Sequence, residues 1–149
     1  MSESQRNAIR NDVAAHIEAV YGPSGKAWFR EVASGPWRPG AHARPRLTVG
    51  DGGQRTADYG DDERNKSFGL ALELTLDLKA NWREEYGEWV DRVQELIADL
   101  YNSLFAWGMI RMDYVEDSPF EVVLSGGSSE QVWLIDFEAT YEQDVGIVE

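Results

Sequence analysis

The chain has 149 residues, enough for one domain with its own hydrophobic core. It contains no cysteine, which excludes disulfide bonds and thiolate metal sites, and its formal charge of −13 argues against a broad basic face for nucleic acid. A polar N-terminus, and no apolar run near the roughly 20 residues of a membrane helix, predict a soluble protein without a signal peptide.

The N-terminal part predicts one helix and two short strands. A stripe of apolar residues indicates a helix over about 4–21, and the breaker sequence at 22–25 ends it. Alternating residues predict strands at about 27–33 and 46–49, joined by a loop rich in glycine and proline. The helical stripe consists of Ile9, Val13, Ile17 and Val20.

The clearest pattern is an unbroken alternation of apolar side chains, which predicts one long strand with a buried face. Its apolar residues are Phe68, Leu70, Leu72, Leu74, Leu76 and Leu78. The residues between them, including Ala71, Glu73 and Thr75, predict a second face exposed to water or to a polar partner. The stretch before this strand, about 50–66, has no periodicity and is predicted to be a mobile loop.

The C-terminal half predicts a long helix followed by a hairpin. The expected elements are a helix at 82–107, a strand or linker at 110–114, strands at 120–124 and 132–141, and a mobile tail at about 142–149. We therefore expect a single α+β domain over residues 1–149, in the order αβββαββ. Both helices have one apolar side, which favours packing on one face of an antiparallel or mixed sheet.

Charge is distributed unevenly along the chain. No lysine or arginine follows Arg111, whereas ten acidic residues do. By contrast, the stretch 32–50 contains Arg38, Arg44 and Arg46 and no acid. This asymmetry fits ordinary solubility, and it also fits complementary contacts between neighbouring copies or a surface that repels nucleic acid.

The sequence contains no recognisable catalytic or metal-binding constellation. His16 and His42 have no partner at ligand spacing. The acidic residues Asp58, Asp61 and Asp62 do not follow the spacing of a calcium-binding loop, and we interpret them as solvated charge. We therefore expect neither enzymatic activity nor a cofactor or bound metal.

The candidate functional residues are instead residues of an interaction surface. Trp37 lies between prolines beside Arg38, which is typical of an interface anchor or of a loop folded back on its own sheet. With Arg44 and Arg46 it is predicted to form one side of a contact between subunits. Glu138 is predicted to lie with other carboxylates on the outer face of the sheet, where solvated charge is the simpler interpretation.

The order of the elements resembles that of the tail-terminator (tail-completion) proteins of long-tailed phages. The resemblance rests on the αβββαββ order, the polar insertion between the second and third strands, and the closing strand Trp133–Tyr141. It implies a hexameric ring that caps the head-proximal end of the tail tube and stops its polymerisation. The implied partners are the tube protein, a neck or connector protein, and DNA that passes without specific binding.

The resemblance also implies a location and a use for the acidic loop. The protein is expected in the host cytoplasm during assembly and then in the virion, with no membrane partner. The loop that carries Asp58, Asp61 and Asp62 is a candidate contact for the tube protein or the ring lumen. Two other interpretations stay open: a neck or head-completion protein, and an acidic inhibitor that mimics DNA and binds a host protein.

Overall fold

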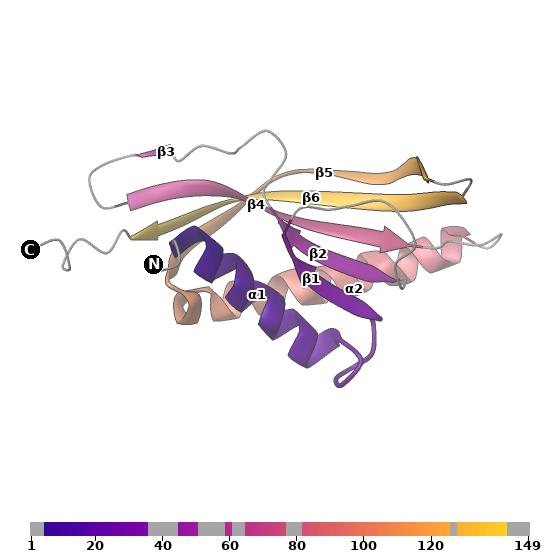
Figure 1. Cartoon of the computed structure of the whole chain (residues 1–149), viewed down its shortest axis with the longest axis horizontal. Coiled ribbons are helices and arrows are strands. Elements are labelled where there is room, and N and C mark those ends of the chain that lie inside the picture. The colour runs from indigo at the N-terminus through magenta and orange to yellow at the C-terminus, as the bar shows by residue number, and fades with distance from the viewer. Residues whose placement is uncertain are drawn as a thin grey trace, which may run out of the picture.

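The computed structural model describes residues 5–35, 45–50, 59–60, 65–76, 82–125 and 128–142. It confirms the α+β prediction, because two helices cover one face of a mixed sheet (Figure 1). The helical elements are α1 (Gln5–Tyr21), α2 (Trp82–Ser103) and the 3-10 turn η1 (Leu104–Trp107). The strands are β1 (Glu31–Ser34), β2 (Arg46–Gly50), β3 (Tyr59–Gly60), β4 (Asn65–Leu76), β5 (Met109–Ser125) and β6 (Ser128–Glu142).

The sheet has two unlike edges. Its strands run in the order β1-β2-β4-β6-β5, and β3 pairs with the start of β4. The β1–β2 pair is parallel, whereas β2–β4, β4–β6 and β6–β5 are antiparallel. One edge is therefore a strand of 4 residues in a parallel pair, and the other is a strand of 17 residues in an antiparallel pair.

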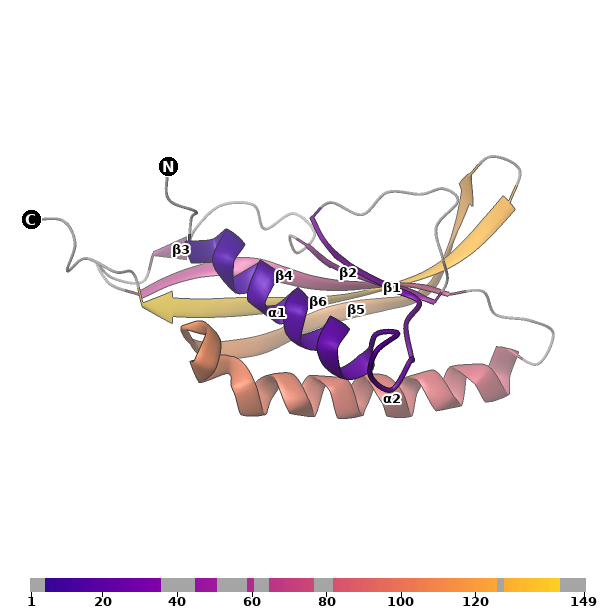
Figure 2. The ribbon, with the colours of Figure 1, turned by 60° about the horizontal axis from the view of Figure 1, so that its bottom comes forward.

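The core lies between the sheet and the helices. On β4, Leu72 is fully buried and pairs in register with Val49 of β2 and Ile135 of β6. The predicted alternation is confirmed for Phe68, Leu70, Leu72, Leu74 and Leu76, and Leu78 lies outside the described residues. Ile9, Val13 and Ile17 of α1 belong to the same cluster. Each such buried side chain stabilises the fold by about 1.5–3 kcal/mol, so this layer holds the sheet to the helices (Figure 2).

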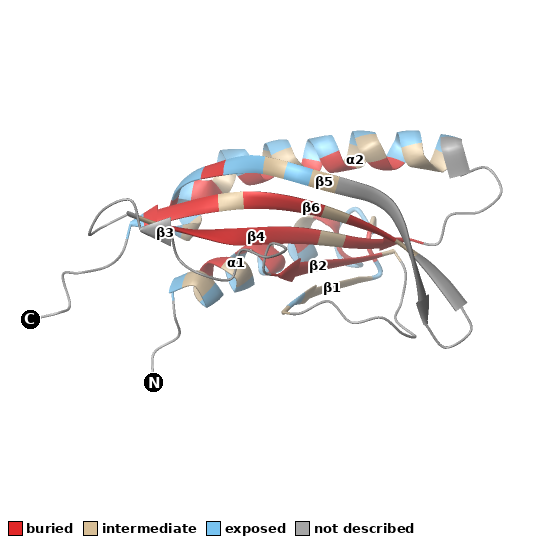
Figure 3. Ribbon diagram, turned by 90° about the horizontal axis from the view of Figure 1, so that it is seen from above, coloured by how far each residue is buried: buried red, intermediate tan, exposed pale blue. Residues whose placement is uncertain are grey.

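The other face of β4 is also buried, which corrects the predicted exposure to water (Figure 3). Ala71 is 0% exposed and Thr75 is 2% exposed, while Glu73 is half-buried. Since β4 is a central strand, its small side chains lie between the side chains of β2 and β6. Thr75 pairs in register with Arg46 of β2 and Val132 of β6, and these longer side chains shield it.

The first strand begins at Glu31 rather than at the predicted residue 27. Ala27 has a φ of 59°, a left-handed conformation that does not continue a strand. The amide of Phe29 donates to the carbonyl of Tyr21 at 3.1 Å, so this segment is tied to the end of α1. Phe29 is 1% exposed and belongs to the core, although it precedes the sheet.

The segments predicted at 110–114 and 120–124 are parts of one strand, β5. Its pairing with β6 shifts register at three places, the last of them between Ser118 and Glu121. Pro119 lies in that shift, which is where an edge strand tolerates a residue without an amide hydrogen. The bulges break the alternating pattern, and this is why the sequence indicates two short segments instead of one strand.

The β5–β6 hairpin extends beyond the rest of the sheet. The last residue of β4, Leu76, pairs with Gln131, and the residues of β6 that precede Gln131 pair with β5. Figure 2 shows this end of the hairpin bending away from the strands beneath it. In the described part of the chain, β5 is the only strand that pairs with β6 before Gln131. A two-stranded ribbon by itself has little independent stability.

The regions predicted to be mobile fall mainly outside the described residues. Within 50–66 the structure places β3 and the start of β4, and β6 continues to Glu142. In the described part of the chain, no helix is long and apolar enough to cross a membrane.

Candidate functional site

The residues predicted to form an interaction surface fall partly outside the described part of the chain. Trp37, Arg38, Arg44, Asp58, Asp61 and Asp62 lie outside the described residues. Their predicted role in subunit or tube contacts stays a prediction. Arg46 and Glu138 are described, and they lie on two different strands of the outer sheet face.

Arg46 has a partner within its own chain. It lies on β2 and is 8% exposed. Its Nε atom lies 3.3 Å from the Oε2 atom of Glu31, and the two residues are register partners in the parallel β1–β2 pair. The guanidinium therefore links the first two strands of the sheet, and its predicted part in a subunit contact is untested.

Glu138 belongs to an acidic strip on the outer face of β5 and β6. It pairs in register with Asp113, and two residues away Asp136 pairs with Glu116. Like charges directly opposite each other destabilise a sheet. Arg111 supplies one counter-charge, since its Nε atom lies 2.8 Å from the Oδ2 atom of Asp113. This acidic strip gives the β5 edge a strongly negative outer face.

The same edge of the sheet and the neighbouring end of α2 carry exposed apolar side chains. The four residues are Tyr101, Phe105, Ile110 and Tyr114, exposed by 40%, 75%, 41% and 54%. They come from the end of α2, from η1 and from the start of β5, and we call them the β5–α2 apolar surface. They include every large apolar side chain that is well exposed in the described residues. Such a concentration marks an interaction site more often than scattered apolar residues do.

Contacts within the chain fix the position of this surface. Burial raises the pKa of Tyr101, Asp113 raises it further, and a backbone hydrogen bond at Tyr114 acts in the opposite direction. These contacts place Tyr101 against β5. The Tyr114 ring meets Phe137 edge-on at 6.2 Å, and its hydroxyl donates to Asp117. Aromatic groups are thus presented on ordered strands and helices rather than on a free loop.

A tight turn connects the two elements that carry the apolar surface. Gly108 has a φ of 83° and donates its amide hydrogen to the carbonyls of Leu104 and Phe105. This left-handed conformation favours glycine and reverses the chain from η1 into β5. Met109 and Met112 then anchor the start of β5 in the core, at 1% and 3% exposed.

Sequence reasoning missed this surface, although a signal was present. Tyr101 and Phe105 each follow a buried leucine of the helical stripe, Leu100 and Leu104. A large aromatic one position past a stripe lies at its margin, where burial and exposure are both compatible with the pattern. Exposure therefore becomes clear only when β5 is placed beside the helix.

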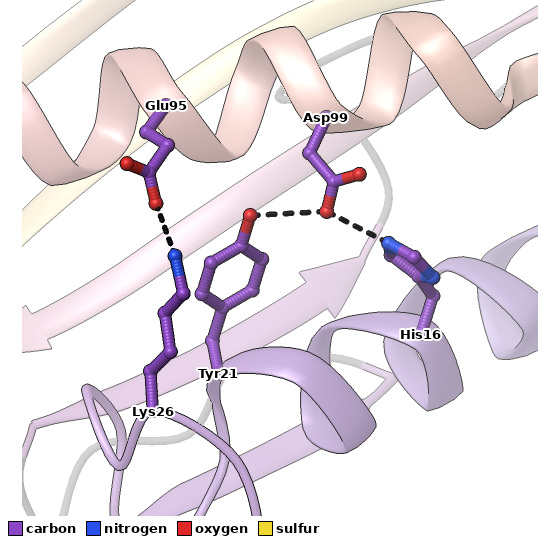
Figure 4. Close-up of polar contacts among 5 residues, drawn as sticks. All are labelled: His16, Tyr21, Lys26, Glu95 and Asp99. Carbon is purple, nitrogen blue, oxygen red and sulfur yellow. Dashed lines mark hydrogen bonds and ion pairs between the residues drawn. The ribbon is translucent and has the colours of Figure 1, made fainter.

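A cluster of polar side chains, separate from the acidic strip, joins the two helices (Figure 4). Asp99 of α2 lies 2.8 Å from the Nε2 atom of His16, and it accepts a hydrogen bond from the hydroxyl of Tyr21 at 3.0 Å. Burial and this carboxylate raise the pKa of Tyr21. One turn away, Lys26 donates to Glu95 at 2.7 Å. This group of polar contacts holds α1 against α2.

Alternating cations and aromatic rings extend the same junction. The Lys26 ammonium lies 5.0 Å from the ring centre of Trp28, and the Arg92 guanidinium lies 5.7 Å from it. Arg92 also lies 4.9 Å from the ring centre of Trp89. Stacking of Trp28 on Tyr21, at 4.6 Å, completes the contact. These interactions fasten the α1–β1 connection to α2.

No group of three histidine, aspartate or glutamate side chains in the described part of the chain is placed to hold a metal ion. No model of a known protein family matches the chain, and no curated protein matches it. The acidic strip and the β5–α2 apolar surface are the two distinctive surface features of the described residues.

Proposed function

We propose that this chain is a structural protein of a phage virion that assembles into a ring and caps the tail tube, as tail terminators do. The observation that carries the proposal is the sheet with two unlike edges, β1 and β5, and both helices on one face. The proposed partners are further copies of the chain, a tail tube protein and a neck or connector protein.

Ring formation needs a contact between two different surfaces of the same chain. A heterologous contact closes into a ring when the rotation between neighbours allows it, whereas a contact of one surface with itself stops at a dimer. The long antiparallel edge at β5 and the short parallel edge at β1 provide two such different surfaces. This asymmetry supports a ring over a two-fold dimer.

The protruding β5–β6 hairpin also supports assembly. Beyond Gln131 its two strands pair with each other. Because two paired strands by themselves are marginally stable in water, a neighbouring subunit or the tube protein that packed against the hairpin would stabilise it. We assign this end of the hairpin to a contact outside its own subunit.

The acidic strip supports passage of DNA without binding. Asp113, Glu116 and Glu138 bring carboxylates together on the outer face of β5 and β6, beside Asp136, which is 6% exposed. Phosphates and carboxylates repel each other, so a channel lined by this face would keep moving DNA from adhering.

The same strip favours a second candidate, an acidic inhibitor that mimics DNA. A host protein that binds nucleic acid would then meet carboxylates at regular intervals, as it meets phosphates on DNA. This candidate requires a stable monomer or dimer and a tight, salt-sensitive complex with a basic protein. A neck or head-completion protein is the alternative within the virion, and it differs in binding the head side rather than the tube.

The first experiment is native mass spectrometry over a concentration series, with and without Mg²⁺, with negative-stain images of the same samples. Closed rings of about six subunits would support the proposal. Addition of the rings to polymerising tube protein would then distinguish a terminator, which stops growth, from a neck protein, which does not. A monomer under every condition contradicts self-assembly and favours the inhibitor.

A further inference from the structure

We infer that two copies of this chain meet in a two-fold contact along the start of β5, where the two edges run antiparallel about Met112. The occupant of this edge is therefore a second copy, and the residues of the contact all belong to the described part of the chain. The inference goes beyond the proposed ring, which joins two unlike edges. A copy whose β5 edge is covered in this way cannot use that edge in a ring, so the dimer would precede ring assembly.

The start of β5 is an open and regular edge of the sheet. In the described part of the chain, β6 is the one strand that pairs with β5. Between two register shifts, the four residues from Arg111 to Tyr114 pair with β6 in unbroken register. Side chains of such a run alternate strictly between the two faces of the sheet. The run therefore presents its side chains in a fixed order to whatever lies beside it.

The charges of this run complement each other across a two-fold axis. Arg111 and Asp113 lie on the outer face, on either side of Met112, and their side chains are 59% and 51% exposed. Within one chain they form an ion pair at 2.8 Å. When two such edges run antiparallel about Met112, Arg111 of each copy comes opposite Asp113 of the other copy. A single surface thus supplies both members of two ion pairs between the copies.

Apolar side chains occupy the positions next to these charges. Ile110 is 41% exposed and Tyr114 is 54% exposed, and both belong to the β5–α2 apolar surface. They lie equally far along the chain from Met112, so the same arrangement brings Ile110 of one copy next to Tyr114 of the other. Burial of apolar area favours the contact, and the charges determine its direction and register.

The same arrangement keeps the other acids of β5 apart. Glu116 lies four residues beyond Met112, and Asp117 follows it. Eight residue positions therefore separate Glu116 from its counterpart in the second copy, which is about 27 Å along antiparallel strands. This separation exceeds the Debye length of about 8 Å at physiological salt, so the repulsion between these acids is largely screened.

Side chains, rather than a full ladder of backbone hydrogen bonds, make this contact. Register shifts bound the regular run at both ends, and bulges on an edge strand limit its pairing with another strand. The Tyr101 side chain also has a hydrogen bond with the backbone of Tyr114, which occupies part of the edge. The exposed charged and apolar groups remain available to a second copy.

Exchange of the two charges tests the contact. Arg111→Asp places an acid opposite Asp113 of the other copy, and Asp113→Arg places two arginines opposite each other. Each variant alone should therefore dimerise at least about tenfold more weakly than the wild type. An equimolar mixture should recover dimers, because one variant then presents only acids and the other only arginines. Sedimentation over a concentration series measures the dissociation constants.

Two variants outside β5 control for net charge and for folding. Arg30→Asp and Glu18→Arg make the same changes in net charge at exposed positions, and both should dimerise like the wild type. Loss of the exposed ion pair should leave the circular dichroism and urea midpoint of the β5 variants unchanged. Dimers that the controls weaken equally, or that the mixture of β5 variants does not recover, overturn the inference.

The outcomes separate this inference from the proposed ring. Dimers that weaken in each β5 variant and return in their mixture support the two-fold contact, whether or not rings form at higher concentration. If they are the largest species at every concentration, the ring proposal is contradicted and the two-fold contact stands. A wild type that forms rings and no dimers overturns the two-fold contact and leaves the ring proposal standing. A wild type that is monomeric under every condition overturns both.

Discussion

Asp99 is the residue through which the two helices interact most directly. Its Oδ2 atom lies within hydrogen-bonding distance of His16 and of the Tyr21 hydroxyl, both on α1. The Tyr21 side chain is 2% exposed, so ionising its hydroxyl would place a negative charge beside Asp99 without much solvent. The fold therefore favours neutral Tyr21, which makes its stability sensitive to alkaline pH.

The first prediction concerns this alkaline sensitivity. The pKa of Tyr21 is raised above its ordinary value of 10.0 by burial and by Asp99. A raised folded-state pKa gives stability that is complete below pH 10 and is lost as the pH rises above it. The free energy of unfolding should fall more steeply above pH 10 in the wild type than in Tyr21→Phe, by up to about 1.4 kcal/mol per pH unit.

Urea unfolding at several pH values between neutral and strongly alkaline measures this difference. Tyr21→Phe should be less stable at pH 8, by about 1 kcal/mol, because it lacks the hydrogen bond to Asp99. This difference in the free energy of unfolding between the two proteins should become smaller as the pH rises. Parallel curves for the two proteins would contradict a raised Tyr21 pKa.

The second prediction separates Arg46 from the rest of the basic stretch. Arg46→Glu places a carboxylate opposite Glu31 at a position that is 8% exposed, so we expect the free energy of unfolding to fall by about 3 kcal/mol or more. Urea unfolding measures the loss. Arg46→Glu with Glu31→Arg restores the pair with reversed polarity and should recover part of the stability. No recovery would show that the pair does not account for the loss.

At the scale of elements, the turn between η1 and β5 controls how the apolar surface is presented. Gly108 has a φ of 83°, and no atom beyond its chain neighbours lies within 4 Å of the position that a Cβ would occupy. A side chain there meets backbone strain rather than a clash. Gly87 lies at an exposed position of α2 and also has free space around it. Its φ lies outside the positive range, so a side chain there meets no backbone strain.

The third prediction uses these two glycines as a matched pair. Gly108→Ala should lower the free energy of unfolding by about 1–2 kcal/mol, the cost of a left-handed residue with a Cβ. Gly87→Ala should raise it by about 0.5–1 kcal/mol, because alanine favours the helix. Urea midpoints of the two variants measure both changes. Equal changes in the free energy of unfolding for Gly108→Ala and Gly87→Ala would contradict the backbone conformations of these two glycines.

The predictability of the elements depended on how regular each pattern is. β4 alternates without a break from Phe68 to Leu76, because one face packs on the helices throughout, and the sequence predicts it correctly. β5 was divided by its bulges and by Pro119, which resemble a turn when the pairing partner is unknown. Positive φ at Ala27 likewise depends on contacts with α1 that no local pattern indicates.

The candidate surfaces were less predictable than the fold. Glu138 was placed correctly on the outer face, because strand alternation determines the face of each residue. The row that it forms with Asp113 depends on the register of β5, which three bulges shift. Exposure of Tyr101 and Phe105 depends in turn on which strand lies beside the end of α2. Long-range placement of this kind is not contained in local periodicity.

At the scale of the whole molecule, a net charge of −13 opposes any assembly of identical copies. This repulsion acts over long distances and is summed over the whole surface. The proposed contact acts at short range, through apolar side chains and close charge pairs. Added salt should therefore affect the two contributions differently.

The last prediction is that moderate salt promotes assembly. Raising the NaCl concentration from about 20 mM to about 200 mM shortens the Debye length from roughly 20 Å to under 10 Å, which screens distant charges more than groups in contact. Wild-type protein should associate at lower concentration in the higher salt, as measured by sedimentation. A DNA mimic bound to a basic protein should behave in the opposite way and dissociate as salt is added. Self-assembly that weakens steadily with salt would mean that charge pairs, not the exposed aromatic residues, dominate the contact between copies.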